Sequence, residues 1–535
     1  MDPRFDLNIR QILHAPAGRN PDQVIVDGSG QARTYRIFHE RIARLAALLV
    51  GQGLGEGKTI AVMDWDTSRY LECFFAIPMV GATLHTVNIR LAPEQIIFTI
   101  NHAEDDAILC HEDFLPILLP LLSRVERPVK LILLAEGKPA AVPEGFIGEY
   151  ETLLAEQPVA FDFPALPEET RATLFYTTGT TGDPKGVSYT HRQLVLHTLA
   201  LAADLGTVPG KGGLKRDDVY MPITPLFHVH GWGFPYIATF LGLKQVYPGR
   251  YDPARLLALI RDHGVTFSHC VPTILAMVIG APEAAATDLT GWKVLIGGSA
   301  LSEGLAGQAR AHGIDVHAAY GMSETCPFVT HADMVASQTS DDLTLRTATG
   351  RPSPLVEVRV VDPDMADVPK DGATTGEIVA RAPWLTQGYL KNVSASADLW
   401  QGGWLHTGDV GHLSPDGTLR ITDRLKDVIK SGGEWVSSLT LENLASTVPG
   451  LIEVAAVGVP DSRWGERPVL VAVMEPSDSV GTAIRQKISA AIERGELPKW
   501  ANPDRICRVA ALPRTSVGKI DKKRIRQMLE SGEIA

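Results

Sequence analysis

A segment rich in glycine and threonine at residues 176–186, YTTGTTGDPKG, is the strongest chemical signal in the sequence. It directly follows an apolar stretch of strand length, Ala172–Phe175. Glycines let backbone N–H groups approach a phosphate with no Cβ in the way, and hydroxyls and a lysine add donors. The spacing is not the Walker pattern, because only two residues separate Gly182 from Lys185. The segment therefore predicts a nucleotide-phosphate loop rather than a surface turn, with the candidate ligands Thr177, Thr178, Gly179, Thr180, Thr181, Gly182 and Lys185.

Four further motifs carry groups suited to nucleotide chemistry: YGMSE at 320–324, WLHTGD at 404–409, DRLKD at 423–427 and PRTSVGK at 513–519. A carboxylate such as Asp409 can accept both ribose hydroxyls, but an aspartate in a turn that contains glycine commonly caps that turn. Considered without the other motifs, Glu324 is best interpreted as a carboxylate that accepts hydrogen bonds from backbone N–H groups at the start of a helix. Tyr320 by itself is best interpreted as a core side chain. Without the other motifs, Lys519 would be interpreted as a solvated surface lysine. Taken singly, these motifs leave both interpretations open.

Taken together and in this order, the five motifs resemble the adenylate-forming superfamily of acyl-CoA synthetases, luciferases and peptide-synthetase adenylation domains. The segments IKSGGEW at 429–435 and FHVHGW at 227–232 are similar to the branch of medium- and long-chain fatty acyl-CoA synthetases, and methylmercaptopropionate-CoA ligases are similar too. The resemblance covers nearly the whole chain. It implies an AMP-forming acyl-CoA synthetase that uses ATP, Mg²⁺ and coenzyme A to convert a carboxylic acid into its thioester, with release of AMP and pyrophosphate.

The resemblance also implies a role for each motif residue. Thr177 and Glu324 would hold Mg²⁺, for which hard oxygen ligands are suited. Asp409 would bind the ribose, and the permanent charge of Arg424 suits ribose or phosphate contacts. The expected nucleotide contacts outside the phosphate loop are Gly298, Ser299, Ala300, Tyr320, Gly321, Met322, Ser323, Asp409 and Arg424. The expected catalytic residues are Lys519, Lys185, Glu324 and His228.

In this family a C-terminal domain rotates between two half-reactions, and Lys426 matches the hinge. Lys519 is expected at the acyl carboxylate and α-phosphate in the first conformation only. In the second, Gly432 and Gly433 would approach the pantetheine tunnel, because glycine permits close backbone contact. The expected coenzyme A contacts are Gly432, Gly433, Glu434 and Trp435. A plain Gly-Gly hairpin turn is the alternative.

Acyl specificity is expected around Phe227, Trp232, Gly297 and Pro327. Trp232 resembles a gate between the nucleotide and the acyl tunnel, with ordinary core packing as the alternative. His228 would orient the substrate or be a satisfied core histidine. Two departures leave the exact acid open: the loop Gly206–Lys215 is long and rich in glycine, and Cys326 stands where serine is frequent. Both are expected near the acyl side.

The elements that position these motifs alternate between strands and helices. Apolar runs such as Thr59–Met63 and Val294–Ile296 have strand length, and Ile37–Leu49 has helical spacing. Such alternation predicts an α/β fold with parallel-rich sheets covered by helices, in which ligands lie at the carboxyl ends of strands. We expect an N-terminal domain over 1–423 that binds ATP and the acyl group, with a β-rich subdomain over 345–423. A hinge at 424–427 and a small mobile α+β domain over 428–535 follow.

The amino-acid composition limits the classes of partner and the compartment that we expect for the protein. The chain has 535 residues and a net charge of −12, from 50 Lys and Arg against 62 Asp and Glu, which argues against nucleic acid as a general partner. Its five cysteines show no C-x-x-C spacing and are expected as free thiols in a reducing, cytoplasmic compartment. No signal peptide is visible, and prolines and histidines interrupt the uncharged run Val219–Leu243, so no integral membrane segment is expected. Homodimers are known in the branch that the chain resembles.

Several functions stay open at this stage. The acid is expected to be a medium- or long-chain fatty acid, with a short, sulfur-containing or aryl acid as the alternative. A nucleotide-binding module without chemistry is the alternative from another class. A third alternative is transfer of the acyl group to a carrier protein instead of free coenzyme A.

Overall fold

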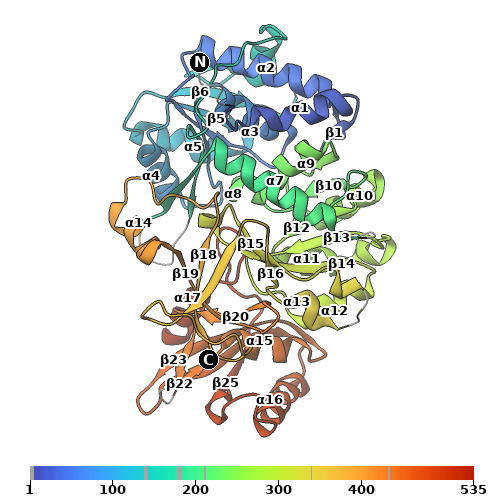
Figure 1. Ribbon diagram of the computed structural model, residues 1–535, viewed down its shortest axis with the longest axis vertical. Helices are drawn as coiled ribbons and strands as arrows, with labels where there is room; N and C mark the ends of the chain where they lie inside the picture. The colour runs from blue at the N-terminus through green and yellow to red at the C-terminus, as the bar shows by residue number, and fades with distance from the viewer. Residues whose placement is uncertain are drawn as a thin grey trace.

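The computed structural model describes residues 5–137, 142–177, 183–209, 212–338, 340, 342–431 and 434–534. Over these residues the chain forms two large sheets with helices around them, a smaller antiparallel sheet, and a C-terminal α+β unit (Figure 1). This confirms the predicted fold class. The exact limits of the three regions remain predictions. No helix in the described part of the chain combines the length and the apolar character needed to cross a bilayer.

The largest sheet is parallel from β1 through β14 and carries antiparallel strands at both edges. In spatial order its described strands are β16 (Arg351–Pro352), β15 (Phe328–His331), β14 (Asp315–Gly321), β13 (Lys293–Ile296), β12 (Phe267–Cys270), β10 (Val219–Pro222), β11 (Lys244–Tyr247), β1 (Val24–Asp27) and β2 (Ala32–Thr34).

The second large sheet is parallel except for its last pair, β8 with β9. Its described strands are β7 (Phe146–Glu149), β6 (Lys130–Leu134), β5 (Ala107–His111), β3 (Thr59–Met63), β4 (Thr83–Thr86), β8 (Arg171–Thr177) and β9 (Lys185–Thr190). Every residue of β4 and β5 is buried, as expected for central strands covered by helices on both faces, and β5 is apolar from Ala107 to Cys110.

Two further sheets follow in the sequence. The first is antiparallel, with β17 (Glu357–Val361), β18 (Gly376–Arg381), β19 (Leu405–Leu413) and β20 (Leu419–Arg424). The second belongs to the C-terminal unit, with β21 (Ile429–Ser431), β22 (Glu434–Val436), β23 (Leu451–Asp461), β24 (Gly465–Met474) and β25 (Arg505–Arg508).

The helices fill the connections between these strands. They are α1 (Arg10–Arg19), α2 (Tyr35–Gly51), α3 (Ser68–Met79), α4 (Pro93–Ala103), α5 (Leu115–Leu121), α6 (Tyr150–Ala155), α7 (His191–Thr207), α8 (Val229–Trp232), α9 (Phe234–Leu241), α10 (Pro253–His263), α11 (Pro272–Ile279), α12 (Glu303–Ala311), α13 (Leu343–Thr347), α14 (Val393–Leu399), α15 (Ser438–Ser446), α16 (Asp478–Glu493) and α17 (Lys522–Glu530).

Local signals explain where the main helices begin. The hydroxyl of Thr34 accepts a hydrogen bond from the backbone of Ile37 at the start of α2, and Thr190 forms a capping box with Gln193 at the start of α7. Helix α3 packs against β3, β4 and β8 of one sheet and β1 of the other, and nearly all its residues are buried. A helix between two sheets must be apolar on all sides, so α3 joins the two sheets through one hydrophobic core.

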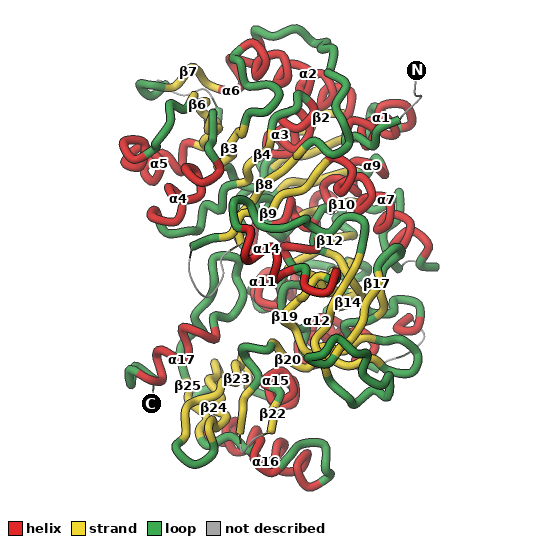
Figure 2. Tube along the Cα trace, turned by 60° about the vertical axis from the view of Figure 1, so that its left-hand side comes forward, coloured by secondary structure: helices red, strands yellow, loops and turns green. Residues whose placement is uncertain are grey.

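The C-terminal unit lies at one end of the molecule, below the antiparallel sheet (Figures 1 and 2). Its two apolar clusters contain only residues from Ile429 onward. Strands β8, β13 and β14 end at the face toward this unit, so loops from both large sheets and from the C-terminal unit can meet there.

Helices α2, α3 and α6 are also joined by a buried ion-pair network. The guanidinium of Arg41 donates to both oxygens of Glu72, at 2.6 and 3.0 Å, and to Glu151 at 2.7 and 2.8 Å. Tyr150 donates to Glu72 at 2.6 Å, and the Glu72 side chain is only 1% exposed. Glu72 therefore depends on Arg41 for its counter-charge.

Replacing Arg41 should destabilise the N-terminal region strongly. We expect Arg41→Leu to lower the free energy of unfolding by about 3–5 kcal/mol, because it leaves a buried carboxylate without its partner. Urea unfolding followed by tryptophan fluorescence measures this. The matched control is Arg36→Leu, whose ion pair with Asp22 is largely exposed and should contribute about 0–1 kcal/mol. Equal effects of the two substitutions would contradict this view of the network.

Candidate active site

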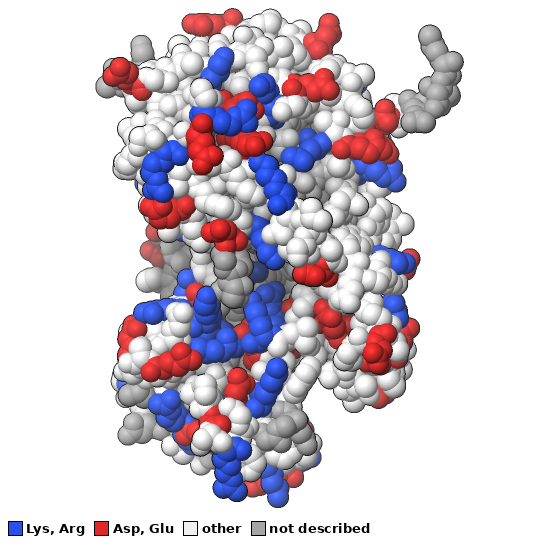
Figure 3. Space-filling model, turned by 90° about the vertical axis from the view of Figure 1, so that its left-hand side faces the viewer, with Lys and Arg blue, Asp and Glu red and all other residues white. Residues whose placement is uncertain are grey.

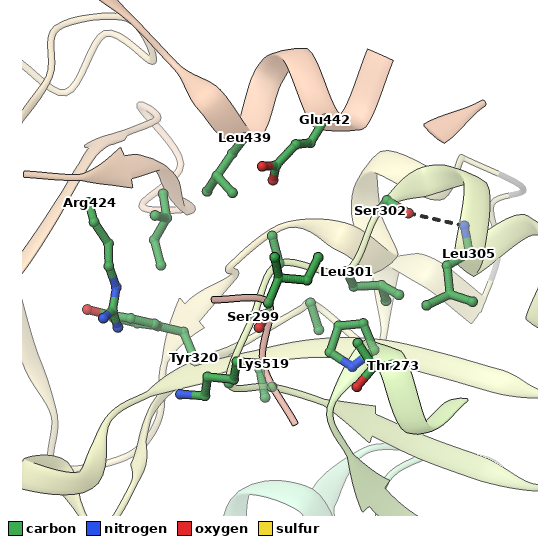
Figure 4. A pocket seen from close by; sticks show the side chains of 18 of the residues that line it. Thr273, Ser299, Leu301, Ser302, Leu305, Tyr320, Arg424, Leu439, Glu442 and Lys519 are labelled. Carbon is green, nitrogen blue, oxygen red and sulfur yellow. Dashed lines mark hydrogen bonds between the residues drawn. The ribbon is translucent and has the colours of Figure 1, made fainter. Parts of the chain in front are cut away.

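A cavity of about 1180 Å³ lies where the ends of the large sheets face the C-terminal unit. Residues from β8, β14, β19 and β20 and from the loop after β13 line it, together with the loop that carries Lys519 (Figure 4). Lysine and arginine side chains also gather along the hollow between the C-terminal unit and the rest of the protein (Figure 3). An acidic chain thus presents a local basic site at this cavity.

Part of the predicted phosphate loop can be placed. Thr177 ends β8 and pairs in register with Lys185 at the start of β9. Thr178, Gly179, Thr180, Thr181 and Gly182 lie outside the described residues. The Lys185 ammonium lies 4.7 Å from the centre of the Tyr389 ring, a cation–π contact that holds it beside Glu324.

Glu324 is a buried carboxylate in the wall of the cavity, next to this lysine. It follows β14 in a short 3₁₀ turn, Ser323–Thr325, and Tyr389 donates to its Oε1 at 2.6 Å. Burial raises the pKa of Glu324, and the hydrogen bond from Tyr389 opposes that shift. A positive ligand in the cavity would favour the charged carboxylate.

The nucleotide residues of the later motifs meet on one wall. The Tyr320 hydroxyl donates to Asp409 Oδ2 at 2.8 Å, and the Arg424 Nε lies 3.0 Å from Asp409 Oδ1. Asp409 is buried at 3% exposure, and its charge raises the pKa of Arg424. Gly298, Ser299 and Ala300 follow β13 and line the same cavity, as do Gly321, Met322 and Ser323.

Lys519 comes from the C-terminal unit and lines this cavity too (Figure 4). A Cβ added at Gly298 would lie 3.0 Å from Lys519 Cε, so the glycine makes room for the lysine stem. Burial and, next, the charge of Arg424 lower the pKa of Lys519 to about 8. The structure thus brings together Lys519, Glu324, Asp409 and Tyr320, which are separated by up to about 200 residues in the sequence.

The adjoining part of the lining forms an apolar wall. Trp232 is buried, and its indole lies so close to Gly297 that an added Cβ there would meet Cη2 at 3.1 Å. Val229, Phe328 and Pro327 complete this wall with His228. Burial and the nearby charge of Lys519 lower the pKa of His228 to about 3, so its ring is neutral at pH 7.

Other predicted residues lie elsewhere. Phe227 is absent from the described cavity lining; it packs in the apolar cluster of α4 and β5, with the Arg90 guanidinium 5.9 Å from its ring centre. Gly432 and Gly433 lie outside the described residues. Glu434 and Trp435 belong to β22, where Trp435 is 51% exposed. Lys426 follows β20 and lines the cavity. The roles of all these residues remain predictions.

Of the two departures noted in the sequence, the described part of the Gly206–Lys215 loop lies apart from the cavity lining, whereas Cys326 adjoins it. In the described part of the Gly206–Lys215 loop, Lys215 donates to the Gly206 carbonyl at 2.9 Å, and Gln338 donates to Pro209 at 3.0 Å. No described residue of this loop lines the cavity. Cys326 is buried behind the lining residue Pro327. The loop closes on itself through its own lysine, and so it stays away from the acyl wall.

Sequence reasoning missed Tyr389, Thr273 and Asn88. Tyr389 touches both Lys185 and Glu324, and Thr273 and Asn88 contact the loop that carries Lys519. A lone tyrosine, threonine or asparagine outside a motif gives no local signal for these roles. Their spacing from the partners, up to 428 residues, becomes contact only in the fold.

The donor set fits a magnesium ion that also binds phosphate. Thr177 and Glu324 both line the cavity and offer hard oxygen atoms, and such sites commonly use one or two protein carboxylates. Among the described residues no group of three or more His, Cys, Asp or Glu could hold a metal by itself. A Mg²⁺ ion held by Thr177 and Glu324 would take its other ligands from water and from substrate phosphates.

Comparison with known protein families agrees with this geometry. The AMP-binding enzyme model matches residues 13–390, and the model of the AMP-binding enzyme C-terminal domain matches residues 440–519. The first of these alone spans more than half of the chain.

Curated relatives and a solved structure are similar over most of their length. The long-chain-fatty-acid–CoA ligase of Thermus thermophilus is 38% identical, over 94% of this chain and 91% of that protein. The 3-methylmercaptopropionyl-CoA ligase of Ruegeria pomeroyi is 36% identical, over 94% and 93%. A crystal structure of an anthranilate CoA ligase in complex with anthranoyl-AMP matches with a TM-score of 0.88 and 21% identity, covering 99% of each chain, and this shows the fold.

The lowered pKa of Lys519 predicts that ATP binding depends on pH. Because the pKa is lowered to about 8, the amine is charged below that pH and neutral above it. We expect the affinity for ATP, measured by calorimetry without acid, to fall as pH rises through 8, by at most about tenfold per unit. Lys519→Arg keeps its charge and should flatten this limb. A limb of the same slope in both proteins would show that another group titrates.

Proposed function

The chain belongs to the AMP-binding enzyme family, and we propose that it activates a medium- or long-chain fatty acid as its coenzyme A thioester. The enzyme is an AMP-forming acyl-CoA ligase that uses ATP and coenzyme A. The balanced reaction is acid plus ATP plus coenzyme A, giving acyl-CoA, AMP and pyrophosphate.

One observation carries the proposal: a single cavity joins a nucleotide wall, an apolar wall and a lysine from the other unit. Tyr320 and Asp409 stand on the first wall, Trp232 on the second, and Lys519 between the two units. A carboxylate is a poor electrophile, so it must meet the α-phosphate of ATP at such a junction.

In the first half-reaction a carboxylate oxygen of the acid attacks the α-phosphorus of ATP in line. The bond from that phosphorus to the bridging oxygen of the β-phosphate breaks, and its electron pair leaves with pyrophosphate. In our proposal Asp409 accepts the ribose hydroxyls, Tyr320 lies along the adenine, and Lys519 donates to the acyl carboxylate and the α-phosphate. Preorganised donors of this kind stabilise charge that develops in the transition state.

The positions of Lys185, His228, Thr177 and Glu324 suggest a role for each of them in our proposal. Lys185, the register partner of Thr177, would donate to the outer phosphates, and neutral His228 would orient the acid on the apolar side. Thr177 and Glu324 would hold Mg²⁺, which when bound neutralises phosphate charge.

In the second half-reaction the thiol of coenzyme A attacks the acyl carbonyl, and AMP leaves with the electron pair of the carbon–oxygen bond. We propose that the C-terminal unit rotates about Lys426 for this step. Gly432, Gly433, Glu434 and Trp435 would then approach the pantetheine arm. The docking of the C-terminal unit through a few polar contacts is compatible with such a motion.

The acid is the least constrained part of the proposal. Apart from His228, the residues named on the acyl wall are Val229, Trp232, Gly297, Pro327 and Phe328, all apolar or glycine. Such a wall suits an uncharged alkyl chain. A short sulfur-containing acid is the alternative, because a relative of similar identity bears the name 3-methylmercaptopropionyl-CoA ligase. Aryl acids complete the set to be tested.

A cytoplasmic location and a homodimer complete the proposal. All five cysteines are buried and free, as expected for a reducing compartment. The dimer rests on the resemblance to the fatty acyl branch alone.

A panel of acids from propionate to palmitate, with 3-methylmercaptopropionate and benzoate, tests the proposal by pyrophosphate release. We expect the highest kcat/KM with a medium or long alkyl chain. Thioester formation with free coenzyme A separates this from transfer to a carrier protein. No acid-dependent pyrophosphate from any acid would favour a nucleotide-binding module instead.

Lys519→Ala should separate the half-reactions. Loss of one charge contact in the transition state is worth roughly 3–4 kcal/mol, so adenylate formation should fall by about 10²–10³. Thioester formation from a supplied acyl-adenylate should be spared, because Lys519 belongs to the first conformation. Equal losses in both steps would contradict the rotating domain.

Trp232→Ala should change the choice of acid. Removing the indole beside Gly297 opens the apolar wall, so the chain-length profile and the KM for the acid should shift while the KM for ATP stays near wild type. Trp232→Phe retains an aromatic ring and should keep most of the original profile. If ATP binding collapses and the acid profile is unchanged, Trp232 is a structural core residue.

A further inference from the structure

The turn that carries Lys519 is closed by its own hydrogen bonds. The Thr515 backbone N–H donates to the Lys519 carbonyl at 2.8 Å, and Gly518 donates to the Thr515 carbonyl at 3.0 Å. The Lys519 backbone N–H donates to the Thr515 hydroxyl at 3.2 Å. The turn is therefore a preformed unit, and its place in the cavity depends on what it contacts.

Two side chains far away in the sequence contact this turn. The hydroxyl of Thr273, at the start of α11, donates to the carbonyl of Gly518 at 2.9 Å. The amide of Asn88, after β4, donates to the Ser516 hydroxyl at 3.1 Å. Between them, Val517 packs against the apolar cluster of α4 and β5. Figure 4 shows Thr273 and Lys519 on the same side of the cavity.

A second contact area supports the same docked arrangement. The Glu303 backbone donates to Asn443 Oδ1 at 3.0 Å, and Asn443 Nδ2 donates to Glu303 Oε1 at 3.1 Å. At Gly304 an added Cβ would lie 2.2 Å from the Ser446 carbonyl oxygen. Helices α12 and α15 thus meet closely, but this area lies away from the lysine. The contacts between α12 and α15 dock the C-terminal unit as a whole, whereas Thr273 and Asn88 donate hydrogen bonds to the Lys519 turn itself.

We propose that Thr273 and Asn88 are positioning residues that hold the Lys519 turn in the cavity and so act on adenylate formation alone. The inference rests on the proposed function, since it assigns these residues to one half-reaction of it. Both donors belong to the N-terminal region, and both acceptors to the C-terminal turn. When the C-terminal unit rotates, the Gly518 carbonyl and Ser516 hydroxyl become solvated and the two hydrogen bonds are lost. The hydrogen bonds therefore stabilise one conformation and not the other.

The test measures the half-reactions separately in three variants of the full-length protein. Thr273→Val keeps the side-chain shape but removes the donor, and Ser516→Ala removes the acceptor from the C-terminal side. Each should slow adenylate formation, followed as pyrophosphate release in one turnover, by about 3- to 10-fold, the usual worth of one hydrogen bond. Thr273→Ser retains the hydroxyl and should restore most of the rate.

The same variants should convert a supplied acyl-adenylate and coenzyme A to thioester at the wild-type rate or faster, because the second conformation no longer competes with a fully docked turn. Their affinity for AMP should be unchanged. The matched control is Thr287→Val, whose hydroxyl donates only within its own turn to the Glu283 carbonyl, and it should leave both half-reactions at wild-type rates.

Three results would overturn the inference: equal losses in both half-reactions, a loss of AMP affinity that accounts for the slower step, or adenylation at the wild-type rate in both Thr273→Val and Ser516→Ala. None of these would affect the proposed function. That function fails on a different result, the absence of acid-dependent pyrophosphate release by the wild-type enzyme.

Discussion

The buried carboxylate of Asp409 joins two sheets of the molecule, because its partners Tyr320 and Arg424 lie on different sheets. Asp409 on β19 is buried, and it accepts hydrogen bonds or charge contacts from Tyr320 at the end of β14 and Arg424 at the end of β20. A buried carboxylate needs such partners, because an unpaired charge in this place would cost several kcal/mol. The hydrogen bond from Tyr320 therefore links the antiparallel sheet to the large sheet, and the ion pair with Arg424 fixes the end of β20, from which the chain enters the C-terminal unit. Because Arg424 is held here, its charge also contributes to the low pKa of Lys519. The partners of one carboxylate thus shape the nucleotide wall, and one of them adds to the effect of burial on the pKa of Lys519.

The C-terminal unit is held in a different way from the two large sheets. Helix α3 joins the large sheets through a continuous apolar core, which cannot separate without exposing a great deal of hydrophobic surface. The C-terminal unit has its own apolar clusters, and it meets the rest mainly through polar contacts at Asn443, Ser438 and the Lys519 turn. Contacts of this kind are worth little individually and can be exchanged for water. Firm joining of the sheets and weak docking of the last unit are what a two-step reaction at one cavity requires.

Elements governed by local sequence were predicted closely. The run Thr59–Met63 is β3 with the same bounds, and Ile37–Leu49 lies within α2, two residues short at each end. The spacing of apolar residues signals both elements, because it reflects burial of the whole strand in one case and of one helix face in the other. The motif residues of the nucleotide wall were predicted only because five motifs in order resembled a family. Tyr389, Thr273 and Asn88 could not be found in this way, because each acts through a partner brought close by the tertiary fold. The Gly206–Lys215 loop was expected near the acyl side. Its Lys215 instead donates a hydrogen bond to the Gly206 carbonyl, and no described residue of the loop lines the cavity.

The apolar wall shows most clearly why function needs the fold. From Val229 to Gly233 all five residues have positive φ, between 49° and 74°, and three of them are not glycine. Left-handed backbone costs roughly 1–2 kcal/mol for each residue other than glycine. The cost is higher for Val229, because its side chain is β-branched. No sequence pattern predicts such a turn. It persists because Val229, His230 and Trp232 are buried in the aromatic core around Phe74, Phe175 and Tyr236, so that relaxing the backbone would expose them. The turn presents Trp232 to Gly297 while His228 lines the cavity. Strain of this kind is stored where geometry matters, and here it sets the position of the indole at the boundary between the nucleotide wall and the acyl wall.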